Sequence, residues 1–352
     1  MVATQQAIDG YTDSQLKVLQ SGYQAAIKNT AEKLASDRRF RSRKALGRKR
    51  EKALLAELRI AEKAISEQLS GAIAADFAEV GLYSKDQIEA IVSWDGKTPG
   101  FNNILLTAQE LEAYSLSLEQ DGYVLEDRLA ADIGSLSEGV KSELVAGRIA
   151  GESARTVAKR IFDAGAGEKT LRQIEGTYLT YIQSANSYAR EQVYAANSDI
   201  VREVEWSAVL ETMSASTGHG TCIKCFGLDG NRYRLDEERP DNPLHNRCRC
   251  LYMPVTTTWQ ELGLDIPEME NEYRRWTERD LATRKILDYG TTDQTKEEWW
   301  FDKSKAWQDN SFGPTRAQMV RAKIIRIDDL SDRQTGEQRT VKELERIARN
   351  RT

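Results

Sequence analysis

The sequence predicts a mainly α-helical protein with one small β unit, an α+β fold. Apolar residues recur at three- and four-residue spacing over most of the chain, which is the period of an amphipathic helix. Between residues 201 and 258 the pattern changes to the alternation that is typical of short strands. All four cysteines fall in that stretch, where we expect them to hold a metal ion that staples the β unit together.

The N-terminal half is predicted to be elongated and helical. Leu16, Leu19 and Tyr23 form one apolar stripe. A second stripe has nearly heptad spacing and predicts a partner helix or a narrow bundle seam. We expect its helix to end at Gly81 and a new one to begin at Ser84. The second stripe consists of Leu54, Leu58, Ala61, Ile65, Leu69 and Ile73.

The turn-forming residues 94–100 give the first boundary, so residues 1–98 are predicted to form one region and residues 99–200 a second helical region. In the second region, Thr107 and Ser135 each precede a glutamate by three residues, which is the spacing of a capping box. A longer helix is expected from about Lys169 to Asn197.

Residues 201–258 are predicted to form the β unit. Val201–Trp206 alternates like a strand, the Asp-Gly pair in Leu228–Asn231 predicts a tight turn, and Arg247–Val255 is expected to be a strand that stops at Pro254. Helices are expected to resume at Trp259, so that residues 259–352 form a Trp-rich helical region. Its five tryptophans are interpreted as core residues, with a protein–protein surface as the alternative.

Composition limits the classes of function. The 352-residue chain has a net charge of −5 and a mean hydropathy of −0.60, and no run of apolar residues is long enough for a membrane span. The N-terminus lacks the charged start and apolar core of a signal peptide, so we expect the chain to stay in the reducing cytoplasm where it is made. The net charge gives no general electrostatic argument for binding nucleic acid.

The cysteines and one histidine have the spacing of a zinc site: Cys222-x-x-Cys225, followed by His245-x-x-Cys248-x-Cys250. Five donors are present for four positions around one structural zinc ion per chain, and His219 is a further, less favoured candidate. Free thiols in a small core remain an alternative. A disulfide is disfavoured by the compartment, and a redox pair because this Cys-x-x-Cys does not open a helix after a strand in a βαβ unit. Catalytic zinc is disfavoured because a sulfur-rich shell leaves no position for water, and His245 lacks the glutamate of a deaminase motif.

A basic stretch without acidic residues lies at 38–50. It could contact DNA through its phosphates, contact an acidic partner, or simply form a solvated helix. Its cations are Arg38, Arg39, Arg41, Arg43, Lys44, Arg48, Lys49 and Arg50.

The chain resembles the phage Mu F-like head-morphogenesis family over roughly Val140 to Ile347, in patches. The cysteine and histidine motifs carry the likeness, together with Glu205-Trp206, Leu228-Asp229-Gly230 and Pro254-Val255. A second part is the tail, with Trp299-Trp-Phe and Phe312-Gly-Pro-Thr-Arg316. Two features differ: Gln183–Asn186 stands where many relatives have Arg-Thr-Glu, and the residues before Cys222 lack their Asp.

This resemblance implies a minor capsid protein of a tailed phage, not an enzyme and with no catalytic residues. Such proteins join the head during assembly in the host cytoplasm, in several copies near the portal, and can leave the virion with the DNA. The implied partners are the portal protein, the major capsid protein and packaged double-stranded DNA. The alternatives are a metal-dependent nuclease that uses His219 and His245, and a zinc-ribbon DNA-binding protein.

Overall fold

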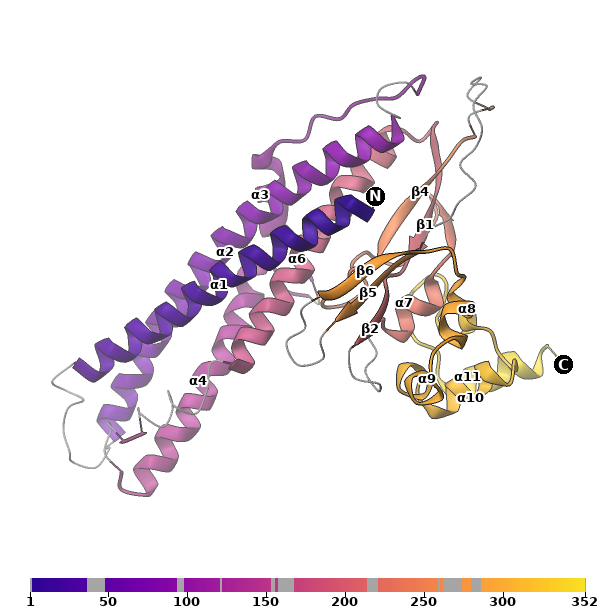
Figure 1. The fold of residues 1–352 in the computed structure, drawn as a ribbon. Coiled ribbons are helices and arrows are strands. Elements are labelled where there is room, and N and C mark those ends of the chain that lie inside the picture. Colours follow the sequence, from indigo (N-terminus) through magenta and orange to yellow (C-terminus); the bar gives the residue numbers. More distant parts are fainter. Residues whose placement is uncertain are drawn as a thin grey trace. The chain divides into compact units, whose positions relative to one another are not determined.

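A computed structural model gives the fold (Figure 1). It describes residues 2–36, 48–93, 98–120, 122–152, 156–157, 168–213, 221–258, 260–261, 274–279 and 286–351. The chain forms two compact units that interleave along the sequence. We call Gln6–Tyr83 with Leu106–Ala185 the helical unit, and Met1–Gln5 with Ser84–Leu105 and Asn186–Thr352 the mixed unit.

In the described part of the chain, five helices contribute to the helical unit, and three of them also extend into the mixed unit. These are α1 (Val2–Ser36), α2 (Arg48–Val92), α3 (Ala108–Ser117), α4 (Leu125–Ile149) and α6 (Glu168–Ala196). The predicted apolar stripes form its core: Leu16, Leu19 and Tyr23 of α1 are buried, as are Ile65, Leu69 and Ile73 of α2. Side chains three and four residues apart lie on one face of a helix, and this face is the one that the unit buries.

One predicted cap is confirmed and two are wrong. Thr107 forms a complete capping box with Glu110 at the start of α3. In contrast, α2 continues through Gly81 and Ser84 to Val92, and α4 continues through Ser135. Gly81 does not end the helix but allows α2 to pack closely against α3, because a Cβ atom at Gly81 would lie 2.9 Å from Leu111 Cδ1.

The predicted small β unit is confirmed as a three-stranded antiparallel sheet in the mixed unit, in the order β3-β1-β4. Its strands are β1 (Val201–Ser207), β3 (Arg232–Arg234) and β4 (Leu251–Thr256). In β1 the predicted alternation buries Val204 and Trp206, and Val201 is buried as well, on the other side of a shift in register between Val201 and Glu203. Strand β4 begins later than predicted and does not stop at Pro254. Proline is tolerated there because β4 is an edge strand, where no further strand needs the missing N–H group.

A second sheet joins one strand of the predicted β unit to two strands that lie in residues 259–352, where only helices were expected. It has the order β2-β5-β6, with β2 (Leu210–Met213) parallel to β5 (Arg274–Arg279) and β5 antiparallel to β6 (Ile286–Thr292). Trp276 of β5 lies opposite Gly290 of β6, where a Cβ atom would lie 2.9 Å from its indole nitrogen. Glycine therefore leaves the space that the indole ring occupies.

Short helices complete the mixed unit around an aromatic core. Trp299, Trp300 and Trp307 are buried, and Trp300 stacks on Phe312 with ring centroids 5.0 Å apart. The interpretation of these tryptophans as core residues is thus confirmed, whereas Trp259 lies outside the described residues. The predicted C-terminal helix is also present. The helices are α7 (Ile223–Leu228), α8 (Lys296–Phe301), α9 (Lys305–Phe312), α10 (Pro314–Arg321), the 3-10 helix η1 (Ile327–Leu330) and α11 (Val341–Arg349).

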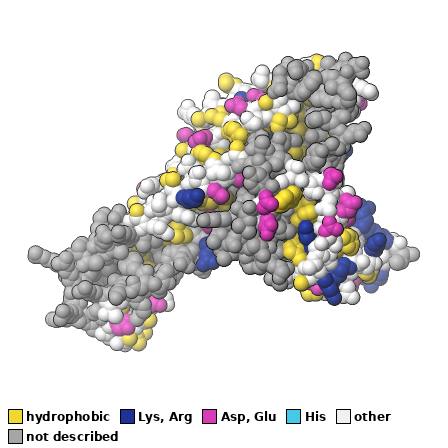
Figure 2. All heavy atoms as spheres, in the orientation of Figure 1, with side chains coloured by type: hydrophobic (Ala, Val, Ile, Leu, Met, Phe, Trp, Pro, Cys, Tyr) yellow, Lys and Arg dark blue, Asp and Glu magenta, His cyan; other side chains and the backbone are white. Residues whose placement is uncertain are grey.

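Two surface features bear on function. Over the described part of the chain, no helix combines the length and apolar character that crossing a bilayer requires. Figure 2 shows Lys and Arg side chains gathered on the visible face of the mixed unit, with Asp and Glu side chains among them.

Candidate metal centre

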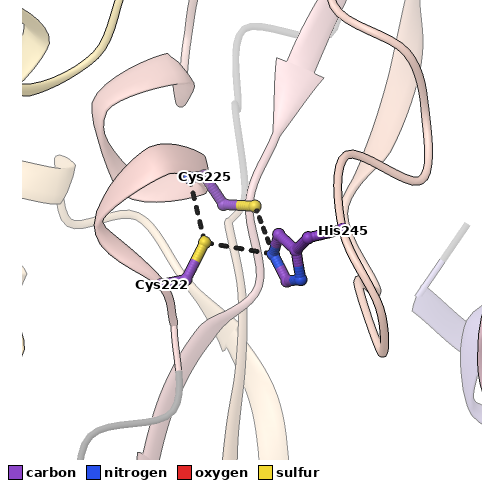
Figure 3. Close-up of side chains that lie close together, drawn as sticks. All are labelled: Cys222, Cys225 and His245. Carbon is purple, nitrogen blue, oxygen red and sulfur yellow. Dashed lines mark hydrogen bonds between the residues drawn. The ribbon is translucent and has the colours of Figure 1, made fainter. Parts of the chain in front are cut away.

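The first segment of the centre is a turn that opens helix α7. Cys222 is the N-cap residue, and its sulfur accepts a hydrogen bond from the backbone N–H of Cys225 at 3.4 Å. A Cys-x-x-Cys sequence at such a turn places both sulfurs on one side of the chain, where they face His245 (Figure 3). This local turn therefore brings together two of the predicted metal ligands, Cys222 and Cys225.

The second segment is the loop that leads from β3 into β4. Within it, the Cys248 N–H donates to the His245 carbonyl at 3.0 Å, and Arg247 adopts a positive φ of 63°. The Asn242 amide donates to the Cys250 carbonyl at 2.9 Å. Strand β4 begins only at Leu251 because the residues before it form this tight loop, in which the side chains of His245 and Cys248 lie close to Cys225 of α7.

The two segments meet at Cys225. Its sulfur lies 3.2 Å from His245 Nε2 and 3.8 Å from Cys248 Sγ. The Cys222 sulfur lies 3.0 Å from the same His245 nitrogen. Two trios result, Cys222–Cys225–His245 and Cys225–Cys248–Cys250, and within each trio all ligand atoms lie within 4.8 Å of one another.

These separations fit a tetrahedral ion. For zinc, with Zn–S of about 2.3 Å and Zn–N of about 2.0 Å, two sulfurs of one shell are roughly 3.8 Å apart and a sulfur and a nitrogen roughly 3.5 Å apart. The distance between Cys225 and Cys248 has that value, and the two sulfur–nitrogen distances are somewhat shorter. The cluster could bind a metal ion such as zinc.

Protonation of the thiols gives independent support. Hydrogen bonding to Cys225 lowers the pKa of the Cys222 thiol to about 5, and hydrogen bonds from Cys225 and Cys250 hold the pKa of Cys248 well below its usual value. The opposite holds for Cys225, whose pKa is raised well above its usual value first by its hydrogen bond to Cys222. Neighbouring buried sulfurs cannot all be ionised without a compensating cation, and a divalent metal ion supplies that charge.

His245 is oriented by its second nitrogen. Nδ1 lies 2.8 Å from the Asn246 carbonyl, so a proton on Nδ1 leaves Nε2 to face the sulfurs. Burial alone would lower the pKa of His245, but hydrogen bonds to Cys222 and Cys248 outweigh it and raise the pKa to about 11. Without a metal the ring is therefore an imidazolium, and a metal ion takes the place of its Nε2 proton.

Residues next to the ligands tie the centre to strand β2. Thr221 precedes Cys222, and its hydroxyl donates to the Val209 carbonyl at 2.5 Å and accepts from the Glu211 N–H at 2.6 Å. Arg249 lies between Cys248 and Cys250 and forms a buried ion pair with the Glu211 carboxylate. Both ligand segments are thus connected to β2 at Glu211.

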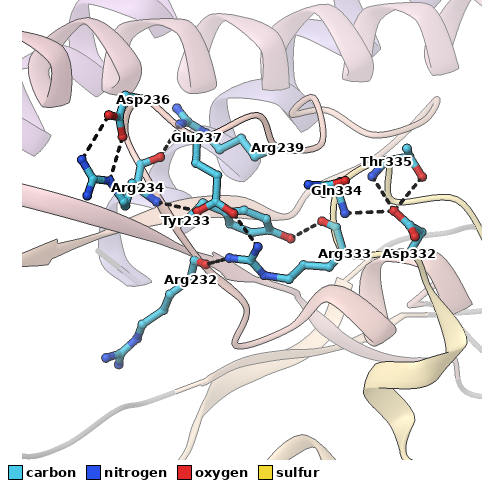
Figure 4. Close-up of polar contacts among 10 residues, drawn as sticks. All are labelled: Arg232, Tyr233, Arg234, Asp236, Glu237, Arg239, Asp332, Arg333, Gln334 and Thr335. Atoms are coloured by element: carbon cyan, nitrogen blue, oxygen red, sulfur yellow. Dashed lines mark hydrogen bonds and ion pairs between the residues drawn. The ribbon is translucent and has the colours of Figure 1, made fainter. Parts of the chain in front are cut away.

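A turn near the C-terminus packs against strand β3 and the residues that follow it (Figure 4). The Arg333 guanidinium pairs with Glu237 and lies over the Tyr233 ring at 4.5 Å, and the Tyr233 hydroxyl donates to the Arg333 carbonyl at 2.7 Å. The Asp332 carboxylate accepts the N–H groups of Gln334 and Thr335 and holds the turn closed. Nearby, a Cβ atom at Gly227 of α7 would lie 2.5 Å from the Ser331 hydroxyl, so the turn packs directly on the helix that carries Cys225.

The structure brings together all five predicted ligands: Cys222, Cys225, His245, Cys248 and Cys250. His219 and the basic residues 38–44 lie outside the described residues. Arg48–Arg50 begin helix α2, where Arg48 and Lys49 are exposed. Sequence reasoning missed Thr221, Glu211 and Arg249, and only the direct adjacency of two of them to ligands could have indicated their role.

Comparisons with known proteins found no match: no family model, no curated protein and no solved structure is similar to this chain.

Proposed function

We propose that this protein is a structural interaction protein whose mixed unit is stapled by one zinc ion. The observation that carries the proposal is the convergence of two chain segments, 222–225 and 245–250, on one largely buried set of sulfur and imidazole donors. Such donors are the ligands that zinc prefers in structural sites. Cys225 is the donor that the two trios share.

A structural role is favoured over a catalytic one by the donor set itself. A catalytic zinc keeps one position open for water and needs a base beside it. Here five donors compete for four positions, and neither trio contains a carboxylate. Glu211, a nearby acid, is engaged by Arg249.

The energetic role of the ion follows from the size of the β unit. Its first sheet has three short strands, and Cys225, Cys248 and Cys250 form part of the same buried cluster as Val204 and Trp206. A core of this size contributes little stability by itself. Metal binding to ligands that are separated in the unfolded chain adds folding free energy on the order of 10 kcal/mol.

We further propose that the chain is a minor head protein of a tailed phage, incorporated near the portal. This rests on the resemblance to the Mu F-like family, whose two parts are the cysteine segment and the tail after Trp299. The packing of Ser331 and Arg333 on α7 and Tyr233 supports it, because both parts belong to one packed unit. The partners would be the portal or major capsid protein and, through the basic stretch, packaged DNA.

Metal analysis of the full chain, purified under reducing conditions, tests the staple. We expect about one zinc ion per chain. Cys225→Ser should lose the zinc, because it removes the donor that both trios share, whereas Cys250→Ser leaves the trio Cys222–Cys225–His245 intact and should retain zinc more weakly. Two results would refute the staple. One is wild-type protein that contains no zinc, and the other is a Cys225→Ser variant that contains as much zinc as the wild type.

Co-expression with the portal protein of the same genome tests the assembly role, and we expect the two to purify together. The Cys225→Ser variant is the control for folding of the mixed unit. Plasmid cleavage that depends on zinc and is lost in His245→Ala would instead establish a nuclease. Failure of the wild-type chain to bind either portal or major capsid protein would reject the head-protein proposal and leave the zinc staple standing.

A further inference from the structure

A cluster of acids and tyrosines lies within the helical unit, independent of the metal centre. The Tyr11 hydroxyl of α1 lies 2.8 Å from Asp76 Oδ1 and 2.7 Å from Glu79 Oε2, both on α2. The Tyr178 hydroxyl of α6 lies 3.0 Å from Asp76 Oδ2. Three helices therefore meet at one chain of short oxygen–oxygen contacts.

Counting hydrogens shows what these contacts require. Each short contact needs one hydrogen, and two hydroxyl groups supply only two. If both carboxylates were ionised, the single Tyr11 hydrogen could serve only one of its two short contacts, and the other would hold the Tyr11 oxygen against an anionic oxygen with no hydrogen between them. A third proton on one carboxyl removes this conflict.

We propose that Asp76 holds this third proton and that the cluster is a pH-sensitive latch that fastens α1 to α2 and α6. The hydrogen bonds then run in one direction: Tyr178 donates to Asp76, protonated Asp76 donates to Tyr11, and Tyr11 donates to Glu79. All three contacts are satisfied, and the one negative charge rests on Glu79, which is exposed to water.

The surroundings of Asp76 support this assignment. Its carboxyl is half-buried, and burial is the main cause that raises its pKa. The charge of Glu79 on its own helix raises the pKa further, while the hydrogen bonds with Tyr11 of α1 and Tyr178 of α6 lower it without reversing the effect, and no cation is among these groups within the described part of the chain. Only a cation would have favoured the ionised form by its charge.

The direction of the pH effect follows from this arrangement. A carboxyl whose pKa is higher in the folded protein than in the opened form stabilises the closed state at low pH. That contribution is lost as the pH rises through the folded pKa. Deprotonated Asp76 can no longer donate to Tyr11, and two anions then compete for one hydroxyl. Helix α1 should therefore open more readily as the solution becomes more alkaline.

Hydrogen–deuterium exchange of the full chain tests the latch. The readout is the protection factor of α1 amides around Leu16–Tyr23, corrected for intrinsic exchange, at about pH 5 and about pH 8. We expect a loss of protection between the two, because the raised pKa of Asp76 means that its proton, and with it the donation to Tyr11, is lost as the pH rises. Asp76→Asn, whose amide can donate to Tyr11 at any pH, should keep high protection at both. Glu67→Gln, an exposed position on the same helix, is the matched control and should behave like the wild type.

Tyr11→Phe carries the test if Asp76→Asn does not fold. It removes the group that links α1 to both acids, so protection should be low already at pH 5 and should not fall further. Equal protection of wild-type α1 at both pH values would overturn the latch. A full pH-dependent fall that persists in Asp76→Asn or in Tyr11→Phe would overturn it as well.

Discussion

Cys225 occupies the place where the two segments of the metal centre meet, and its protonation links zinc affinity to pH. The pKa of Cys225 is raised well above its usual value, as is that of Cys250, and the pKa of His245 is raised to about 11. These three groups therefore carry protons at neutral pH when no metal is bound. A metal ion binds their deprotonated forms, so binding must release protons.

Zinc affinity should consequently increase with pH. For each proton that is released, the dissociation constant should fall about tenfold per pH unit below the pKa of the group concerned. Competition against a chelator of known affinity between about pH 6 and pH 8 measures this dependence. His245→Cys provides a comparison, because it replaces the imidazolium by a thiol in the same loop. An affinity that does not change with pH would contradict the assigned protonation of the free site.

Strand β2 carries none of the five ligands but is connected to the centre through Thr221 and through the largely buried pair of Arg249 and Glu211. Removing one partner of a buried ion pair leaves the other charge unpaired and costs about 3–5 kcal/mol. Glu211→Ala should therefore lower the free energy of unfolding of the mixed unit by about this amount and weaken zinc binding. The double variant with Arg249→Ala should recover part of the loss. Chemical denaturation followed by tryptophan fluorescence measures both effects, and strictly additive losses would show that the pair is not coupled.

Helix α2 offers a second test, because two of its glycines have different surroundings. A Cβ atom at Gly81 would lie 2.9 Å from Leu111 Cδ1, and Leu111 is fully buried, whereas a Cβ atom at Gly71 would meet nothing within 4 Å. Alanine favours a helix over glycine by about 1 kcal/mol. Gly71→Ala should therefore stabilise the helical unit by up to about 1 kcal/mol, and Gly81→Ala should destabilise it by about 1–3 kcal/mol through overpacking. Thermal unfolding followed by circular dichroism compares the two, and equal stabilisation would refute the packing role of Gly81.

For the whole molecule, the sequence predicted what depends on local spacing. The apolar stripes of α1 and α2, the Thr107 cap and the two halves of the ligand set each involve residues a few positions apart, so their geometry follows from one helix or one turn. Features that join distant segments were missed. Strand β2 pairs with β5 more than sixty residues later in the chain, and Arg274–Arg279 has only Trp276 as an apolar residue. The cluster of Tyr11, Asp76 and Tyr178 likewise comes from three helices, and none of its members is marked by its neighbours in sequence.

The division into two units makes the effect of zinc on the whole chain measurable. All seven tryptophans of the sequence fall within Ser84–Leu105 and Asn186–Thr352, the mixed unit, whereas most of the long helices belong to the helical unit. Tryptophan fluorescence therefore reports on the unit that carries the metal centre, and circular dichroism at 222 nm reports mainly on the other.

Because the staple acts within the mixed unit, removing zinc with a strong chelator under reducing conditions should shift the fluorescence toward that of exposed indole while most of the helical signal persists. Heating the zinc-loaded chain should then give a fluorescence transition that moves to lower temperature on chelation and a helical transition that does not. The Cys225→Ser variant should match the chelated wild type without any chelator, and a fluorescence transition that is the same with and without zinc would show that the ion does not hold the mixed unit together.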